Sequence, residues 1–247
     1  MNDQSPSGTK SLSQFLDEIQ AHSATIADKK WKSLHLMCRI FEANLADFNE
    51  LMTWATTQQN AVEIVQNARP STVQEEFFFQ LAKETHNLGA SVGSLIDHTR
   101  RLVESYPAGK FRTEYETRKD LVAKSDCAAF VKNFRNYMLH YDVPPFAFQF
   151  SVRNTPQGQI EEARVQLDSA KLLAWSSWTT AAKNYIEGSG SRVDLAKTFT
   201  DYSQLIRDLY TWLMSQFETL HGTEIQDANA LISEARRSYG FEDSPDI

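Results

Sequence analysis

The stretch NLGASVGSLIDHTRR, Asn87–Arg101, lies in the middle of a long run of helical periodicity and is unusually rich in small residues. Apolar residues recur three and four positions apart over 72–106, which predicts one continuous helix of roughly 50 Å. Gly89 and Gly93 fall inside it, where a glycine costs about 1 kcal/mol of helix stability relative to alanine. We therefore expect something to pack very close to this helix: another helix of the same bundle, a dimer partner or a ligand.

Most of the remaining chain carries the same helical pattern. A helix is expected to begin near Leu12, and the cleanest apolar stripe, over 195–217, predicts a long helix that ends at His221-Gly222 and is followed by a short one. Residues 108–124 are charged and are predicted to form a connection with a short helical piece. The other expected helices cover 34–55, 126–141 and 169–187.

Between residues 146 and 168 the hydrophobic period changes from helical spacing to alternation. Phe146 and Phe148 alternate with small or polar neighbours, the letters NTPQG form a turn, and Val165 and Leu167 alternate in the same way. This pattern predicts a β-hairpin. Since two strands alone are barely stable, its apolar face should pack on the helices or on a partner. The sequence thus predicts a mainly α fold, a bundle of long helices with one β-hairpin insertion.

Length and composition fit a single globular domain with an elaboration. The chain has 247 residues, of which 41% are hydrophobic and 23% charged. Residues 1–10 are polar and are predicted to be disordered, 11–240 to form the helical domain, and 241–247 to form an acidic tail. We find no secretory signal and no apolar run of the ~18–20 residues that span a bilayer, so we expect a cytoplasmic protein without membrane contact.

Charge and cysteine content limit the chemistry. A net charge of −7 argues against a simple nucleic-acid coat protein, but not against an enzyme that holds RNA in one local basic cleft. Cys38 and Cys127 lie in apolar-periodic segments and are interpreted as buried free thiols, since two cysteines cannot form a four-thiolate metal site. The sequence has no HExxH, CxxC or glycine-rich phosphate loop, so no metal and no cofactor are expected.

The segment FVKNFRNYMLHYDVPP, 130–145, holds the residues best suited to catalysis. At 100° per residue, Asn133, Asn136 and His140 share one flank of the predicted helix, whereas Arg135 lies well away from His140. An imidazole exchanges protons near neutral pH and a guanidinium binds phosphate, so the set suits metal-free cleavage of a phosphodiester. Taken alone, an Arg-x4-His spacing also occurs by chance on the polar side of ordinary helices.

This segment resembles the HEPN superfamily (higher eukaryotes and prokaryotes nucleotide-binding). The signature of that family is an arginine, usually followed by a polar residue, and then a histidine after four to six intervening residues, near the end of a late helix. Arg135, Asn136 and His140 match this order, with four residues between arginine and histidine. The resemblance implies a helical bundle that acts as a metal-independent endoribonuclease, with Arg135, His140 and Asn136 as its catalytic residues.

The same resemblance implies several partners. RNA would be the substrate, and a homodimer would bring two copies of the motif into one cleft. Such proteins are common in toxin–antitoxin and phage-defence systems, so an antitoxin or a defence protein is an expected partner. Some family members have lost activity, which leaves an alternative: a non-catalytic helical module that binds a nucleotide or a protein. A third alternative is an unrelated helical bundle in which the motif is a coincidence.

A second polar cluster lies late in the long helix that contains the small residues. Asp97, His98 and Arg101, together with Asn133, are weaker candidates for substrate binding in the same cleft. The alternative interpretation is a solvated helix face, on which Asp97 and Arg101, four residues apart, form an ordinary surface ion pair.

Overall fold

The structure is a computed structural model, and it describes residues 10–65, 72–155 and 158–240. Apart from Lys10, the predicted disordered segment 1–10 and the predicted acidic tail 241–247 lie outside the described residues. Helices dominate, and they are joined by one long antiparallel hairpin and a third short strand. The predicted fold class, mainly α with a β-hairpin insertion, is therefore confirmed.

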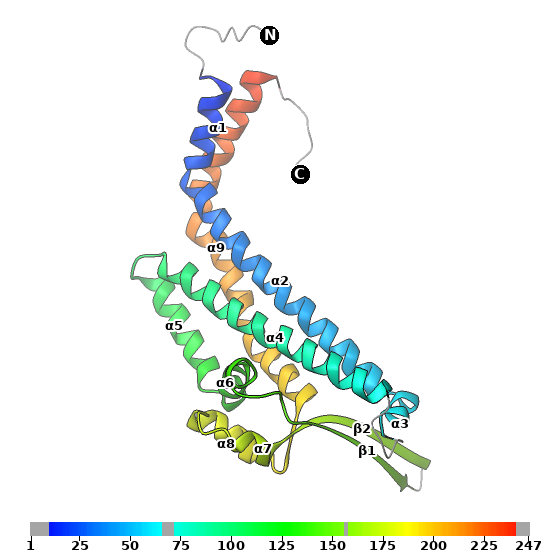
Figure 1. Cartoon of the computed structure of the whole chain (residues 1–247). Helices are drawn as coiled ribbons and strands as arrows, with labels where there is room; N and C mark the ends of the chain where they lie inside the picture. The colour runs from blue at the N-terminus through cyan, green and yellow to red at the C-terminus, as the bar shows by residue number, and fades with distance from the viewer. Residues whose placement is uncertain (1–9, 66–71, 156–157, 241–247) are drawn as a thin grey trace. The chain divides into compact units, whose positions relative to one another are not determined.

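The order of the elements along the chain can be followed in Figure 1. They are α1 Leu12–Ala21, α2 Ser23–Thr56, α3 Gln58–Val65, α4 Thr72–Glu104, α5 Lys110–Ala123, α6 Asp126–His140, β1 Phe146–Thr155, β2 Gly158–Asp168, α7 Ser169–Leu173, α8 Thr180–Gly188, β3 Arg192–Asp194 and α9 Leu195–Tyr239. The sheet has the order β1-β2-β3, and both pairings are antiparallel.

The chain divides into two compact units, and the single helical domain over 11–240 stays a prediction. The central unit is Leu36–Tyr210, and the terminal unit is formed by the described residues up to His35 and from Thr211 onward. The boundaries fall inside α2 and α9, so each of these helices contributes one segment to each unit.

The terminal unit is held by aromatic contacts between α1 or α2 and the last part of α9. The rings of Phe15 and Tyr239 meet edge to face with centroids 6.4 Å apart, and those of Trp31 and Phe217 are 5.6 Å apart. The Tyr239 hydroxyl also donates a hydrogen bond of 2.9 Å to the carbonyl of Lys10. Aromatic pairs of this kind add to the apolar area that they bury.

In the central unit the hairpin packs on helices, as the sequence predicted. The ring of Phe146 in β1 stacks on that of Phe78 in α4, with centroids 6.5 Å apart, and Phe148 meets Phe77 at 5.8 Å. Strand register places Phe146 opposite Leu167, which is fully buried. The alternating apolar residues therefore face the helices, and the helical core stabilises a hairpin that would be marginal alone.

Two predicted segments differ from the observed ones. The charged segment 108–124, predicted as a connection with a short helical piece, forms the helix α5 over 14 residues, because Phe111 and Tyr115, one turn apart, are both buried on one side of it. The helix predicted over 169–187 is interrupted after α7. Thr179 begins a new helix there by accepting a hydrogen bond from the backbone N–H of Ala182.

The prediction that a helix ends at His221-Gly222 is wrong, since α9 runs without interruption from Leu195 to Tyr239. The His221 ring packs on Phe217 with centroids 5.5 Å apart and bonds to Glu224, so this turn is held by ordinary helical neighbours. The glycine with a positive φ that ends the helix is Gly240, at +69°.

Both cysteines are free thiols, with Cys127 buried and Cys38 half-buried. Burial raises the pKa of Cys127 to about 11 and that of Cys38 to about 12, so both remain protonated and unreactive near neutral pH. Among the described residues, no helix combines the length and the apolar character that crossing a lipid bilayer requires.

Two glycine substitutions test the continuity of α9. A methyl group on Gly222 would meet no atom within 4 Å, so Gly222→Ala should raise the free energy of unfolding by about 1 kcal/mol. Gly240→Ala is the matched control and should lower it, because its φ disfavours any side chain. Urea denaturation followed by circular dichroism measures both changes. Destabilisation by Gly222→Ala would mean that the helix ends there.

Candidate functional site

The candidate motif lies on α6, a helix whose two ends are determined by its sequence. The Ser125 side chain accepts a hydrogen bond from the backbone N–H of Ala128 and caps the first turn, as predicted. The helix ends at His140, three residues before Val143, which precedes a proline and is therefore biased away from helical backbone angles. The motif thus occupies the last two turns of a short, capped helix.

One face of α6 is fixed by an aromatic cluster. Phe130, Phe134 and Tyr137 are buried there, and the indole ring of Trp178 stacks on Phe130 at 5.5 Å and on Tyr137 at 5.7 Å. The Trp178 indole N–H donates to the carbonyl of Leu172, which orients the ring. Trp178 is thus a packing residue. Because this face is fully packed, the side chains on the rest of the helix have a rigid support.

Asn133, one of the weaker candidates, is occupied by structural hydrogen bonds. Its amide nitrogen donates to the carbonyl of Ala129 at 2.8 Å and to the hydroxyl of Thr179 at 3.3 Å. Its amide oxygen accepts from the backbone N–H of Thr179 at 3.3 Å. The Asn133 side chain, which is buried, therefore joins α6 to the first turn of α8.

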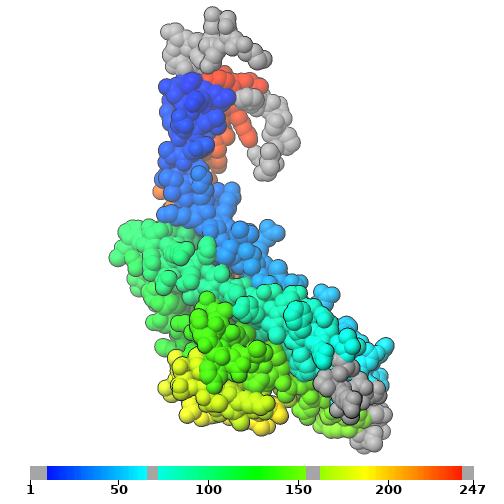
Figure 2. Space-filling model, viewed as in Figure 1, coloured from blue at the N-terminus to red at the C-terminus, as the bar shows by residue number. Residues whose placement is uncertain are grey.

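Gly89 and Gly93 of α4 are the surface on which the other side of α6 rests. A methyl group on Gly89 would lie 2.6 Å from Cε of Met138, and one on Gly93 would lie 2.7 Å from Cζ of Arg135. The close partner that the small residues predicted is therefore a helix of the same bundle. Figure 2 shows this face, on which α6 and the residues after it (bright green) adjoin α4 (teal).

Arg135 lies half-buried against Gly93, and this contact is the main geometric feature of the motif. Its Nε is buried and has no hydrogen-bond partner among the described residues. Its Nη1 donates to Oδ1 of Asn136 at 3.3 Å, and no described carboxylate forms an ion pair with it. The permanent positive charge of Arg135 is thus half-buried and has no compensating negative charge among the described residues.

Asn136 connects the arginine to the flank that carries the histidine. Its side chain accepts from Arg135 and lies one helical turn before His140, on the same side of α6. His140 is exposed, and its ring bonds to no described residue. Arg135 and His140 are five residues apart, which is about 7.5 Å along the helix axis, and they leave the helix on different sides. One copy of α6 therefore does not direct the imidazole of His140 and the guanidinium of Arg135 at the same substrate atom.

The second polar cluster lies near the other end of α6. The two helices are antiparallel, because Gly89 contacts Met138 and Gly93 contacts Arg135, while Ile96 and Thr99 line a cavity with α6 residues 128–133. Asp97, His98 and Arg101 are therefore level with the first half of α6, whereas His140 is its last residue. Within one protomer this cluster does not face His140.

The predicted ion pair in that cluster involves a different arginine. Asp97 pairs with Nη2 of Arg100 at 3.2 Å, three residues away, and both side chains are at least half exposed. Exposed pairs of this kind contribute little to stability. Arg101 lies in the last turn of α4, where its positive charge interacts favourably with the carbonyl end of the helix.

The role of Gly93 as the seat of Arg135 could be foreseen only in part. The pair of glycines four residues apart showed that a neighbour comes close, but nothing in the sequence identified an arginine side chain as that neighbour. Among the described residues, no group of three histidine, cysteine or acidic side chains is close enough to hold a metal ion.

A double-mutant cycle on Gly93→Ala and Arg135→Ala tests this seat. In the wild-type background the methyl group of Gly93→Ala must displace the Arg135 guanidinium. The change in the free energy of unfolding on Gly93→Ala should therefore be about 1–2 kcal/mol more unfavourable there than in the Arg135→Ala background. Urea denaturation of the four proteins gives the coupling. Gly222→Ala serves as the control and should have the same effect in both backgrounds. Additivity within about 0.3 kcal/mol would show that Arg135 does not rest on Gly93.

Comparison with known proteins adds no family to this description. No protein-family model, curated protein or solved structure matches the chain. The resemblance to the HEPN superfamily therefore stays a hypothesis based on Arg135, Asn136 and His140 and on the helix that carries them.

Proposed function

We propose that the protein is an HEPN-like, metal-independent endoribonuclease that cleaves RNA in a cleft formed by two protomers. His140 would take the proton from the 2′-hydroxyl that attacks the phosphate, and Arg135 would stabilise the charge that builds up on the phosphate oxygens. Asn136 would hold the guanidinium in place. The observation that carries this proposal is the unpaired cation of Arg135 in its glycine seat.

The energetics of Arg135 support a functional role. A half-buried guanidinium with an unsatisfied nitrogen contributes less to the stability of the folded protein than an apolar side chain of similar size would. Sites that carry such a cost are commonly binding or catalytic sites, because a ligand supplies the missing hydrogen bonds. A phosphate group matches the need, since its oxygens accept several N–H bonds from one planar guanidinium.

The separation of Arg135 from His140 supports the dimer. A catalytic pair needs both groups at one phosphate, and a second copy of α6 would supply the group that the first copy cannot direct there. Exposed apolar side chains also lie next to His140: Tyr141 is 51% exposed and Val143 is 67% exposed, with the exposed Asp142 between them. Exposed apolar side chains beside a polar site are typical of a protein–protein interface.

In the cell, such an enzyme would fit the role of a toxin or a phage-defence effector in the cytoplasm, controlled by an antitoxin or another partner protein. The second candidate function is a non-catalytic helical module that binds a nucleotide or a protein. It is favoured by the separation of Arg135 from His140 on one copy of α6, because a guanidinium without an ion-pair partner can bind a phosphate group with no histidine beside it.

RNA cleavage in the presence of EDTA tests the proposal directly. The wild-type protein should release fragments that end in 2′,3′-cyclic phosphate, and His140→Ala should lower the rate by about 100-fold or more. His35→Ala, which removes another exposed histidine, is the control and should keep full activity. Equal rates for wild type and His140→Ala, with both proteins folded by circular dichroism, would contradict the proposal.

A mixing experiment tests whether the cleft is shared. Arg135→Ala and His140→Ala should each be inactive alone. If each cleft takes its arginine from one protomer and its histidine from the other, an equal mixture should recover about a quarter of wild-type activity, because half of the dimers are mixed and one of their two clefts is intact. A mixture that stays inactive after subunit exchange would show that the pair does not combine across the dimer in this way.

A further inference from the structure

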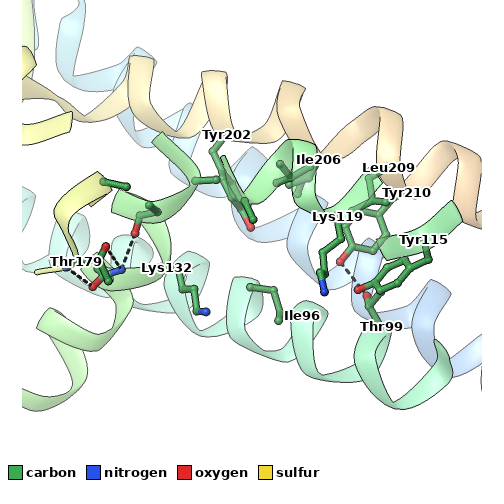
Figure 3. Close-up of a pocket in the computed structure, with 16 residues that line it drawn as sticks. Ile96, Thr99, Tyr115, Lys119, Lys132, Thr179, Tyr202, Ile206, Leu209 and Tyr210 are labelled. Carbon is green, nitrogen blue, oxygen red and sulfur yellow. Dashed lines mark hydrogen bonds between the residues drawn. The ribbon is translucent and has the colours of Figure 1, made fainter. Parts of the chain in front are cut away.

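The central unit contains a cavity that the proposed ribonuclease site does not use. It has a volume of about 520 Å³ and lies among α4, α5, α6, α8 and α9 (Figure 3). Cavities of roughly 300–1,000 Å³ are the ones that hold small molecules in proteins. Most of its walls are apolar, and the aliphatic side chains come from Ile96, Val122, Ala128, Ile206 and Leu209, among others.

Tyr202 presents an unused hydrogen-bonding group to this cavity. The residue is only 4% exposed, and its hydroxyl bonds to no described residue. In Figure 3 the hydroxyl points from α9 into the space between the helices, toward the side where Ile96 lies. The hydroxyl is not among the fully buried polar atoms that lack a partner, so water can reach it from the cavity, and a ligand that displaces this water would have to replace its hydrogen bond. Burial also raises the pKa of Tyr202, which keeps the hydroxyl neutral and able to donate.

A neighbouring tyrosine shows the contrast. The Tyr210 hydroxyl lies 2.9 Å from Oγ1 of Thr99, and Thr99 uses its own proton in a bond of 2.7 Å to the carbonyl of Leu95. Tyr210 is therefore the donor to Thr99 and is satisfied within the protein. The Tyr210 hydroxyl is thus used within the protein, whereas the hydroxyl of Tyr202 can bond to a ligand; Tyr115 is a third tyrosine on the cavity wall, in Figure 3 beside Thr99 and Tyr210.

Positive charge is present on the same wall. Lys132 of α6 and Lys119 of α5 line the cavity, and in Figure 3 their ammonium groups lie on either side of the Tyr202 hydroxyl. Lys119 pairs with Glu116, whereas Lys132 forms no ion pair with a described residue. The ammonium of Lys132 has one positive charge and three N–H donors, and Tyr202 adds an O–H donor, so together they suit a singly charged group with two acceptor oxygens.

We infer that this cavity binds a small carboxylate with an apolar body, such as a medium-chain fatty acid, whose two oxygens accept from Lys132 and Tyr202 while the chain lies among the aliphatic side chains. A phosphate ester carries close to two negative charges near pH 7, and Lys132 would balance only one of them, since Lys119 is already paired with Glu116. The inference goes beyond ribonuclease activity and does not depend on it, because Arg135 and His140 do not line this cavity.

Isothermal titration calorimetry with octanoate, decanoate and dodecanoate, below their micelle concentrations, tests the inference on the full chain without RNA. We expect one molecule per chain, and an affinity that rises about fourfold for each added CH₂ that enters the cavity. Dodecanol, which has the same chain without the charge, should bind at least about tenfold more weakly. The absence of saturable binding, or equal binding of dodecanol and dodecanoate, would overturn the inference.

Two substitutions identify the groups that hold the carboxylate. Lys132→Gln and Tyr202→Phe should each weaken dodecanoate binding by about tenfold, because each removes one hydrogen bond to a charged oxygen. Lys171→Gln and Tyr141→Phe remove the same groups outside the cavity and should bind as wild type does. Thermal unfolding by circular dichroism verifies that each variant is folded. Wild-type affinity in Lys132→Gln or in Tyr202→Phe would overturn the assignment.

Discussion

The close approach of α4 and α6 at Gly89 and Gly93 fixes the position of the side chains that matter most. Hydrogen in place of a side chain lets Met138 and Arg135 lie directly against the backbone of α4. The opposite face of α6 is packed on the rings of Trp178 and its aromatic neighbours. A helix held on two sides in this way has little freedom to rotate or slide, so its polar side chains keep their directions.

This arrangement gives α6 different tasks on different sides. The buried side supplies core packing, Asn133 joins the helix to α8, and Lys132 reaches the cavity. Arg135 packs against Gly93 of α4, and His140 is the last residue of α6 and is exposed. The proposed nuclease chemistry and the proposed ligand site therefore use separate residues of one rigid helix.

Much of the fold follows from periodicity alone. The long apolar stripes predict helices, and the alternating residues of 146–168 predict the two strands of a hairpin. The failures have local causes. Buried Phe111 and Tyr115 turn a charged segment into a helix, and Thr179 starts a new helix within a run whose apolar spacing gave no sign of a break. Gly222 could end a helix or sit inside one, and only the packing around it decides.

The site was less predictable than the fold, because its features depend on contacts between segments far apart in the sequence. The motif spacing identified Arg135 and His140, but the seat of the arginine on Gly93 lies 42 positions away in the chain. Tyr202 gave no signal at all, since an aromatic residue in an apolar stripe normally belongs to the core. Only the fold shows that its hydroxyl ends in an open space.

The antiparallel pairing of α4 with α6 has a thermodynamic consequence for the whole central unit. The cavity and the Arg135 seat occupy successive segments of the same helix pair, so both are lost when that pair separates. A molecule that fills the cavity would raise the free energy needed to separate α4 from α6. Because Arg135 leaves Gly93 when the two helices separate, the contact of Arg135 with Gly93 would be stabilised by the same amount. Linkage of this kind is reciprocal, and an anion bound at Arg135 would tighten the cavity in return.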